Sequence, residues 1–337
     1  MARSRPVCGR VPHRRARRAT VRAHRRRPFH RTRHAAAAGA GGPARTGSDP
    51  GVSKPYAEVI GDPIAQSKSP AIHNFWLGKL GIEAEYRACH VRTEGLADYF
   101  ARRREDANWR GCNVTMPHKQ EVRPYLGHLD PLAKQIGAVN TVVREGAGPL
   151  SGYNTDVAGF LEPLLPLLGQ PHLFRMARVL GTGGAARAIV AALSAEGFVI
   201  VLAGRDPTKA QALLKELASG RDHRPVDIVH FADPTDFAFD DRSGCLDLII
   251  NASPLGMAGQ PSLAFDFTHV PPGSVVYDIV THPVDTPLLA AARDAGLRTI
   301  DGLAMLIGQA AAAFEMFFGV KPPREDGDAE LRALLTR

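Results

Sequence analysis

The residues best suited to chemistry in this chain are a lysine and an aspartate, each at the end of a polar segment that begins with glycine. Lys119 closes GCNVTMPHK (111–119), and Asp156 closes GYNTD (152–156). Taken singly, Lys119 is an ordinary surface lysine and Asp156 an ordinary helix cap. Both, however, follow short hydrogen-bonding side chains at predicted strand ends, where side chains converge on a cleft. A lysine near a carboxylate can exchange a proton with a carbonyl oxygen, which suits reduction of a ketone by hydride.

A glycine-rich loop, GTGGAARA (181–188), follows an apolar strand pattern and precedes a helical one. Gly181, Gly183 and Ala186 fit the G-x-G-x-x-G/A form of dinucleotide-binding loops. There the first glycine permits a tight turn, the second lets the backbone approach a pyrophosphate, and the small third residue lets helix and strand pack closely. A plain tight turn is the alternative, but the flanking pattern favours a dinucleotide site.

The segment AGRDPTKA (203–210) lies at the end of the next predicted strand, where the two nicotinamide cofactors are distinguished. Arg205 and Lys209 could face a 2′-phosphate, since the planar guanidinium suits that group. Asp206 could instead accept a ribose hydroxyl, or lie in a solvated charge cluster at the start of a helix. The pattern favours NADP as cofactor and leaves NAD open.

Two serines precede a predicted helix in GDPIAQSKSPAIHN (61–74), and Pro70 is expected at the first helical position. Ser69 could simply cap this helix. Ser67 and Ser69 could equally bind a substrate carboxylate beside the helix N-terminus. The residues alone leave both interpretations open.

Two α/β units are needed to position these residues. From Tyr56, short apolar runs alternate with helical stretches, and a short helix within 131–144 leads into the strand AVNTVVR; Asp156 is expected at the N-cap of the next helix. A second series from Arg178 holds about five strands with crossovers, which predicts a parallel doubly wound sheet. The apolar run 303–318 is expected to be buried against the first unit, and residues 322–337 to form a short exposed helix.

Composition excludes several other classes of protein. The 337 residues have room for two domains, and no stretch approaches the roughly 20 apolar residues that span a bilayer, so we expect no membrane partner. The four cysteines form no CxxC pair, so neither a disulfide framework nor a metal site is indicated. A reducing cytoplasm is the simplest compartment. These cysteines are Cys8, Cys89, Cys112 and Cys245.

Positive charge is concentrated at the N-terminus. Residues 1–54 hold 14 arginines, Lys54 and one acid, Asp49, for a formal charge of +14; the whole chain carries +8, so the remainder carries −6. With few large aliphatic residues, this head is predicted to be disordered. It could be a nucleic-acid-binding tail, an organellar transit peptide, or the product of a start site assigned too far upstream in GC-rich DNA. The last is favoured, so no nucleic-acid partner is expected.

Together these segments resemble the shikimate dehydrogenase family, oxidoreductases that reduce 3-dehydroshikimate to shikimate with NADPH on the route to chorismate and the aromatic amino acids. The resemblance runs in order from residue 56 to about residue 320. It implies an α/β substrate domain formed by residues 55–157 and 302–325. A Rossmann-type NADP-binding domain, residues 158–301, is inserted between them. The disordered head, residues 1–54, lies outside the resemblance.

The resemblance also implies roles for individual residues. Lys119 is the catalytic lysine, and Asp156 is its partner and a ligand of the ring hydroxyls. Substrate binding is implied for the serines as carboxylate ligands and for three further side chains: Ser67, Ser69, Thr115, Asn140 and Gln309. Cofactor binding is implied for the glycine loop and two later residues: Gly181, Thr182, Gly183, Gly184, Ala185, Met257 and Gly302. Arg205 and Lys209 complete the expected NADP contacts.

Two departures from the family pattern bear on specificity. Gly204, Arg205 and Asp206 stand where Asn-Arg-Thr is common, and Thr281 stands where a tyrosine is usual. They motivate a rival function, a quinate or dual quinate/shikimate dehydrogenase that uses NAD. A second rival is a non-catalytic NADP-binding regulator that docks on nucleic acid through the basic head; the intact Lys119 and Asp156 disfavour it. A monomer or a homodimer is expected.

Overall fold

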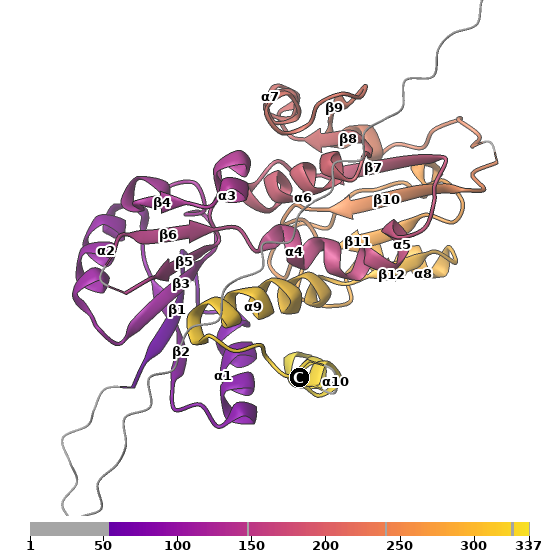
Figure 1. Cartoon of the computed structure of the whole chain (residues 1–337). Helices are drawn as coiled ribbons and strands as arrows, with labels where there is room; N and C mark the ends of the chain where they lie inside the picture. The colour runs from indigo at the N-terminus through magenta and orange to yellow at the C-terminus, as the bar shows by residue number, and fades with distance from the viewer. Residues whose placement is uncertain (1–53, 147, 240, 325–326, 337) are drawn as a thin grey trace, which may run out of the picture. The chain divides into compact units, whose positions relative to one another are not determined.

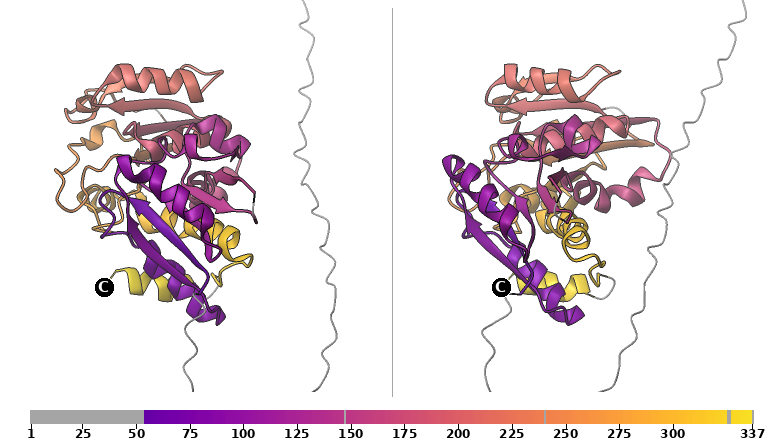
Figure 2. Two further views of the ribbon diagram at one scale, coloured as in Figure 1. Left: turned by 90° about the vertical axis from the view of Figure 1, so that its left-hand side faces the viewer. Right: turned by 60° about the vertical axis from the view of Figure 1, so that its left-hand side comes forward.

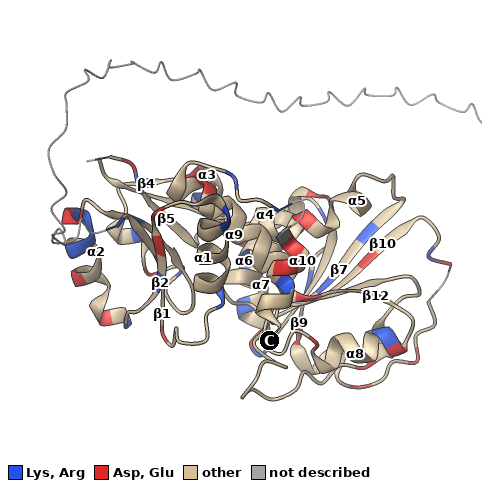
Figure 3. Ribbon diagram, turned by 90° about the horizontal axis from the view of Figure 1, so that it is seen from below, with Lys and Arg blue, Asp and Glu red and all other residues tan. Residues whose placement is uncertain are grey.

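The computed structural model describes residues 54–146, 148–239, 241–324 and 327–336 (Figure 1). The predicted disordered head lies outside these residues except for Lys54, an exposed side chain whose ammonium bonds Glu83 at 2.5 Å. Along the described ribbon, basic and acidic residues are interspersed, as on α2 (Leu96–Glu105) and α8 (Pro287–Asp294) (Figure 3). Within this part of the chain, no helix has the length and apolar character needed to cross a membrane.

The first sheet has the strand order β2-β1-β3-β5-β6-β4. β1 runs parallel to β2 and β3, whereas β5 runs antiparallel to both β3 and β6. The strand bounds are β1 Tyr56–Gly61, β2 Glu85–His90, β3 Trp109–Val114, β4 His128–Leu129, β5 Thr141–Arg144 and β6 Leu150–Tyr153. The predicted strand from residue 138 therefore begins later, at Thr141, and β6 was not anticipated.

The antiparallel insertion determines where polar side chains meet. In register, Asn113 near the end of β3 faces Thr141 at the start of β5, and Thr141 in turn faces Tyr153 at the end of β6. The end of β3, the start of β5 and the end of β6 therefore share one edge of the sheet. The loops that carry Lys119, Asn140 and Asp156 all leave from this edge.

The second sheet is entirely parallel, with the order β12-β11-β10-β7-β8-β9. Its strands are β7 Phe174–Leu180, β8 Val199–Gly204, β9 Arg224–Asp227, β10 Cys245–Asn251, β11 Val275–Asp278 and β12 Arg298–Ile300. The chain moves outward from β7 in one direction and resumes at β10 in the other. This reversal of strand order confirms the predicted doubly wound fold and places the switch point between β7 and β10, where such folds bind ligands.

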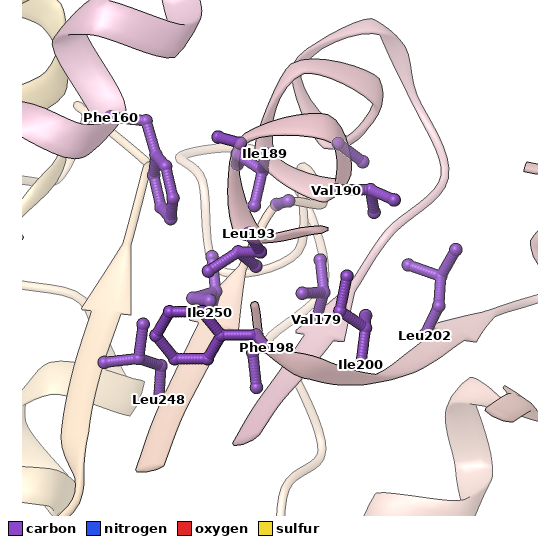
Figure 4. Close-up of a cluster of buried hydrophobic side chains, with 14 of the residues drawn as sticks. Phe160, Val179, Ile189, Val190, Leu193, Phe198, Ile200, Leu202, Leu248 and Ile250 are labelled. Carbon is purple, nitrogen blue, oxygen red and sulfur yellow. The ribbon is translucent and has the colours of Figure 1, made fainter. Parts of the chain in front are cut away.

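The core of the second sheet lies beneath α6 (Gly184–Ala195). In Figure 4, Ile189 and Leu193 of this helix lie over Val179, Ile200 and Ile250 of three neighbouring strands. All five are fully buried. This packing fixes α6, and with it the glycine loop at its N-terminus. The remaining helices around the two sheets are α1 Ser69–Leu80, α3 Pro131–Ile136, α4 Asp156–Leu161, α5 Leu165–Leu168 and α7 Pro207–Leu217.

The last two helices pack against the first sheet's helices. α9 (Gly302–Phe318) contacts α4 and α1 and buries Phe314 and Phe317 in the cluster that holds β1 and α1, which confirms the predicted burial of this segment. A short exposed helix was predicted within residues 322–337; the helix is present as α10 (Gly327–Leu335), but one of its faces is buried. Its Leu331 and Leu335 are buried in the same cluster, because α10 lies beside α1 (Figure 2).

His73 is the most unusual core residue of α1. Its ring is fully buried and stacks on Tyr86, with centroids 3.9 Å apart and planes within 5°. Neither ring nitrogen has a hydrogen-bond partner among the described residues. Burial disfavours the charged imidazolium and lowers the pKa of His73 to about 3.

We predict that His73 makes the protein sensitive to mild acid. Below the ordinary pKa of 6.5, the unfolded chain gains a proton that the folded chain does not take up until about pH 3. The contribution of His73 to the free energy of unfolding is thus complete above pH 6.5. It decreases as the pH falls, by about 1.4 kcal/mol per pH unit, or about 2 kcal/mol by pH 5.

Chemical unfolding at pH 7 and pH 5 tests this prediction. His73→Phe should lose this part of the pH dependence, whereas the exposed His128→Gln should retain it. An unchanged difference between the two pH values in His73→Phe would contradict the prediction.

Candidate active site

Lys119 lies in a loop after β3 that is held by several hydrogen bonds. The backbone N–H of His118 donates to the carbonyl of Thr115 at 3.0 Å, and the carbonyl of Lys119 accepts from Val139 at 2.7 Å. The buried ring of His118 also makes a 2.6 Å hydrogen bond to the carbonyl of Val91. These bonds fix the lysine backbone, so its long side chain starts from a defined position.

Asp156 is the first residue of α4, and its predicted role as the N-cap was wrong. Thr155 is the N-cap, and no side chain there caps the helix. Instead, Asn154 accepts a bond from the backbone N–H of Asp156 at 3.1 Å and donates to the carbonyl of Ala138 at 3.0 Å. Because Asn154 orders the turn, the carboxylate of Asp156 is not needed as a cap and bonds to Lys119 and Asn140 instead.

The lysine and the aspartate form a nearly buried ion pair. Lys119 Nζ donates to Asp156 Oδ2 at 2.6 Å, and the side chains are 14% and 5% exposed. Asn140 Nδ2 donates to the other carboxylate oxygen, Oδ1, at 2.9 Å. Charge-assisted bonds to both oxygens offset the cost of removing the carboxylate from water. The pair thus presents a lysine nitrogen in a fixed direction, as a proton donor or acceptor requires.

Asn140 joins the ion pair to a wider polar network. Its Oδ1 accepts from the backbone N–H of Thr155 at 2.7 Å and from the hydroxyl of Thr141 at 3.0 Å. Its Nδ2 also donates to Gln309 Oε1 at 3.2 Å. The predicted residues Lys119, Asp156, Asn140 and Gln309 are therefore brought together by direct hydrogen bonds.

Sequence analysis missed the second half of this network. Asn113 Nδ2 donates to Thr141 Oγ1 at 3.0 Å, and Asn113 Oδ1 accepts from the buried hydroxyl of Tyr86 at 2.6 Å. Asn113 and Thr141 are neighbours across β3 and β5. The available signal was an asparagine inside the apolar strand CNV, because a buried polar side chain needs partners. Tyr86 had no such signal, since it reads as an ordinary strand residue.

Gln309 reaches the network because two helices cross closely. A Cβ added to Gly159 of α4 would lie 2.6 Å from the backbone N of Gln309 and from the carbonyl oxygen of Met305. A Cβ on Gly308 of α9 would lie 3.0 Å from Cα of Gly159. A side chain at either position would force the helices apart and move Gln309 away from Asn140.

The serines and Thr115 leave the same edge of the sheet but do not join the network. Ser69 is buried and begins α1, so Pro70 is the second helical residue and not the first as predicted. Ser67 Oγ accepts weakly from the backbone N–H of Ser69 at 3.3 Å, and no side chain caps the helix. Thr115 packs against the end of β1, where a Cβ on Gly61 would meet its methyl group at 2.5 Å. Among the described residues, no recorded hydrogen bond links these three side chains to Lys119 or Asp156.

The glycine loop has the geometry that a pyrophosphate requires. Gly181 has φ of +121°, and a Cβ there would lie 2.6 Å from the carbonyl oxygen of Ala252, so a side chain is excluded. Gly183 is the N-cap of α6, with no side-chain cap, no acidic residue in the first turn and open space where a Cβ would be. The free N–H groups and positive end of the helix fit an anion. Thr182 and Ala185 are half-buried within this loop.

Lys119 lies directly against the same loop. A Cβ added to Gly184 would lie 3.2 Å from Cδ of Lys119 and 3.4 Å from its Cβ. The absence of a side chain at Gly184 therefore lets the lysine stem pass between its own loop and α6. The ion pair and the dinucleotide loop are contiguous.

Arg205, Asp206 and Lys209 are exposed at the end of β8. Asp206 caps α7: its Oδ1 accepts from the hydroxyl of Thr208 at 2.5 Å, from the N–H of Thr208 at 2.9 Å and from the N–H of Lys209 at 3.3 Å. The hydrogen bond from the Thr208 side chain, more than the other contacts, lowers the pKa of Asp206. Its carboxylate is thus engaged by its own helix, whereas Arg205 has no recorded bond within the described residues.

A buried polar pair shapes the segment that carries Met257. Asn251 at the end of β10 donates to Asp278 at 3.0 Å and to the carbonyl of Leu255 at 2.9 Å. Burial raises the pKa of Asp278, whose oxygens also accept from Thr286 and Val280. Met257 is half-buried in this loop. Sequence analysis identified the segment but missed Asp278.

Gly302 begins α9 where a side chain would collide with the loop after β11. A Cβ there would lie 2.2 Å from the carbonyl oxygen of Val280, next to the half-buried Thr281. Within the described residues, no cluster of histidine, cysteine, aspartate and glutamate has the arrangement of a metal site.

Comparisons with known proteins bear on this arrangement. Residues 59–142 match the shikimate dehydrogenase substrate binding domain, and residues 302–332 match the shikimate 5′-dehydrogenase C-terminal domain. A shikimate dehydrogenase (NADP(+)) of Sphingopyxis alaskensis is 50% identical over 286 residues, which cover 84% of this chain and 97% of the relative.

Two solved structures are also similar. A shikimate dehydrogenase in complex with NADP+ has a TM-score of 0.74 and 31% identity, over 87% of this chain and all of the other. The shikimate 5-dehydrogenase of Thermus thermophilus, in complex with NADP(H) and shikimate, has a TM-score of 0.67 and 33% identity, over 83% and 99% of the two chains.

Proposed function

The chain belongs to the shikimate dehydrogenase family, and we propose that Lys119 and Asp156 are its acid–base pair. The reaction is the reversible, NADPH-dependent reduction of 3-dehydroshikimate to shikimate, an oxidoreduction at a CH–OH group (EC 1.1.1.25) on the route to chorismate and the aromatic amino acids. The observation that carries the proposal is the 2.6 Å ion pair lying against the glycine loop.

The proton chemistry falls to Lys119. NADPH, when bound, supplies the hydride that reduces the ring ketone carbon and is itself oxidised to NADP+. The Lys119 ammonium donates one proton to the carbonyl oxygen, which becomes the hydroxyl, and the neutral lysine regains a proton from solvent. Asp156 accepts a hydrogen bond from the lysine nitrogen and so holds its direction. The reverse reaction uses neutral Lys119 as the base.

Substrate positioning is assigned to the side chains around this pair. Asn140, Asp156, Gln309 and Thr115 offer the amide, carboxylate and hydroxyl groups that bind ring hydroxyls. Ser67 and Ser69 are assigned to the substrate carboxylate. In support, neither serine is the N-cap residue of α1, and both lie at the N-terminus of that helix, whose positive end favours an anion. Holding the carboxylate at one end orients the ketone toward the lysine at the other.

Cofactor binding is assigned to the loop from Gly181 to Ala185, to Met257 and to Gly302. The pyrophosphate of the cofactor is assigned to the backbone N–H groups at the start of α6. Arg205 and Lys209 are assigned to the 2′-phosphate. Both are exposed after the end of β8, the strand that pairs with β7 next to the glycine loop, and Arg205 has no recorded hydrogen bond within the described residues. The cap that Asp206 forms through Oδ1 supports this assignment, because it gives that carboxylate a role at the start of α7.

We further propose a substrate domain of residues 55–157 and 302–325 and a cofactor domain of residues 158–301. α10 belongs with the substrate domain, because Leu331 and Leu335 pack in the cluster that contains α1. The cytoplasmic location and the monomeric or homodimeric state stay predictions.

Comparing shikimate and quinate, each with NADP+ and NAD+, tests the function. We expect the highest kcat/KM for shikimate with NADP+. The rival quinate dehydrogenase using NAD is motivated by Thr281, and a higher kcat/KM for quinate with NAD+ would establish it in place of our proposal.

Two variants sharpen the cofactor comparison. Arg205→Ala should lower kcat/KM for NADP+ about tenfold, the scale of one lost charged hydrogen bond, with little effect on NAD+. Asp206→Asn retains a capping side chain and should leave the ratio of kcat/KM for NADP+ to kcat/KM for NAD+ nearly unchanged. If Asp206→Asn instead reduces activity with NAD+ alone, its carboxylate binds the ribose and our assignment is wrong.

We predict that Lys119→Ala lowers kcat by about 100-fold or more, with a smaller effect on substrate affinity, because removal of a general acid or base has this scale. Steady-state kinetics measures it, with the exposed Lys134→Ala as control. An unchanged kcat in Lys119→Ala would exclude the proposed role.

A further inference from the structure

The residue between the two serines makes an unexpected long-range contact. Lys68 is the N-cap of α1, and its Nζ donates to the main-chain carbonyl of Leu335 at 2.6 Å, 267 residues away in the sequence. Leu335 is the last residue of α10. The Ser67–Ser69 turn is thus tied to the C-terminal end of the final helix.

The contact suits both partners electrostatically. The last carbonyls of a helix lack partners within it and carry partial negative charge, so a lysine ammonium is favoured there. The Lys68 ammonium is engaged by α10, and no side chain caps α1. The positive end of α1, next to the serines, is therefore available to an anion.

α10 is held along its length. Leu331 and Leu335 are buried in the cluster that holds Ile72 and Trp76 of α1. At the other end of the helix pair, Lys79 of α1 bonds Glu330 at 2.6 Å. The two helices therefore run in opposite senses, because the start of α1 contacts the end of α10 and the end of α1 contacts Glu330.

A second connection leads from α10 toward the ion pair. Arg332 of α10 bonds Asp301, and Asp301 caps α9 by accepting from the N–H groups of Leu303 and Ala304. α9 carries Gln309, which accepts from Asn140. α10 thus contacts the start of two of the elements that carry assigned substrate ligands, α1 and α9.

We propose that α10 acts as a strap that orders the carboxylate-binding turn, and that Lys68 is the positioning residue through which it acts. Lys68 does not touch the substrate; it holds the Ser67–Ser69 backbone against the C-terminal end of α10. This inference rests on the proposed function, because it requires the serines to bind the substrate carboxylate.

Lys68→Met tests the strap, and Lys79→Met is the matched control, since both remove one lysine contact between α1 and α10. We expect Lys68→Met to raise KM for shikimate about tenfold, the scale of one lost charged hydrogen bond, with kcat and KM for NADP+ within about twofold of the original values. Lys79→Met should leave all three constants nearly unchanged. Equal KM values for shikimate in the two variants would overturn the strap.

Leu331→Ala distinguishes the strap from direct binding of substrate by Lys68. It loosens α10 without changing Lys68, so a strap predicts a raised KM for shikimate in the folded variant, checked by circular dichroism. A normal KM in Leu331→Ala together with a raised KM in Lys68→Met would mean that Lys68 binds substrate itself, and would overturn the strap.

Ser67→Ala and Ser69→Ala separate this inference from the proposed function. If both raise KM for shikimate while Lys68→Met behaves like Lys79→Met, the carboxylate site stands and the strap fails. If neither serine variant raises KM, the carboxylate assignment fails, and with it the role given to the strap.

Discussion

The interaction on which the site depends is the nearly buried ion pair between Lys119 and Asp156. Two charges removed from water are stable only where further hydrogen bonds compensate them. Here Asn140 bonds the second carboxylate oxygen, while Asn154 fixes the backbone of Asp156. The pair therefore depends on a network of residues carried by β3, β5, β6 and α9. The antiparallel insertion in the first sheet brings the end of β3, the start of β5 and the end of β6 to one edge.

A second constraint comes from the dinucleotide loop. In the proposed mechanism, Lys119 must lie beside the cofactor site in order to protonate the carbonyl oxygen. The glycine at position 184 lets the Lys119 stem lie against the glycine loop, because it has no side chain. In the same way, the absence of side chains at Gly159 and Gly308 brings α9, and hence Gln309, to the network. Backbone positions without side chains thus determine where the polar groups meet.

Much of the fold was predictable because its signals are local. The glycine loop between β7 and α6 and the alternating strands and helices of the second sheet follow from periodicity and turn chemistry. Lys119 and Asp156 were identified from their polar segments, whereas Asn140 and Gln309 were identified through the resemblance. The structure shows why the four are neighbours. Asp206 was left with two interpretations, a ribose contact or a place at a helix start, and the cap that it forms with Thr208 favours the second.

What escaped prediction depends on distant partners. Asp156 was expected at an N-cap because Asp commonly caps helices, but Asn154 orders that turn and frees the carboxylate. α10 was expected to be exposed because its segment is polar; its two buried leucines have meaning only once α1 lies beside it. Asn113, Thr141 and Tyr86 join the network across strands whose pairing a single sequence does not specify.

The most direct test of the account is a double-mutant cycle on the ion pair. Because Lys119 and Asp156 are held to act as one unit, kcat of the Lys119→Ala/Asp156→Ala double variant should be no lower than that of the slower single variant. Losses that multiply in the double variant would mean that the two residues act independently, and would contradict the acid–base pair proposed here.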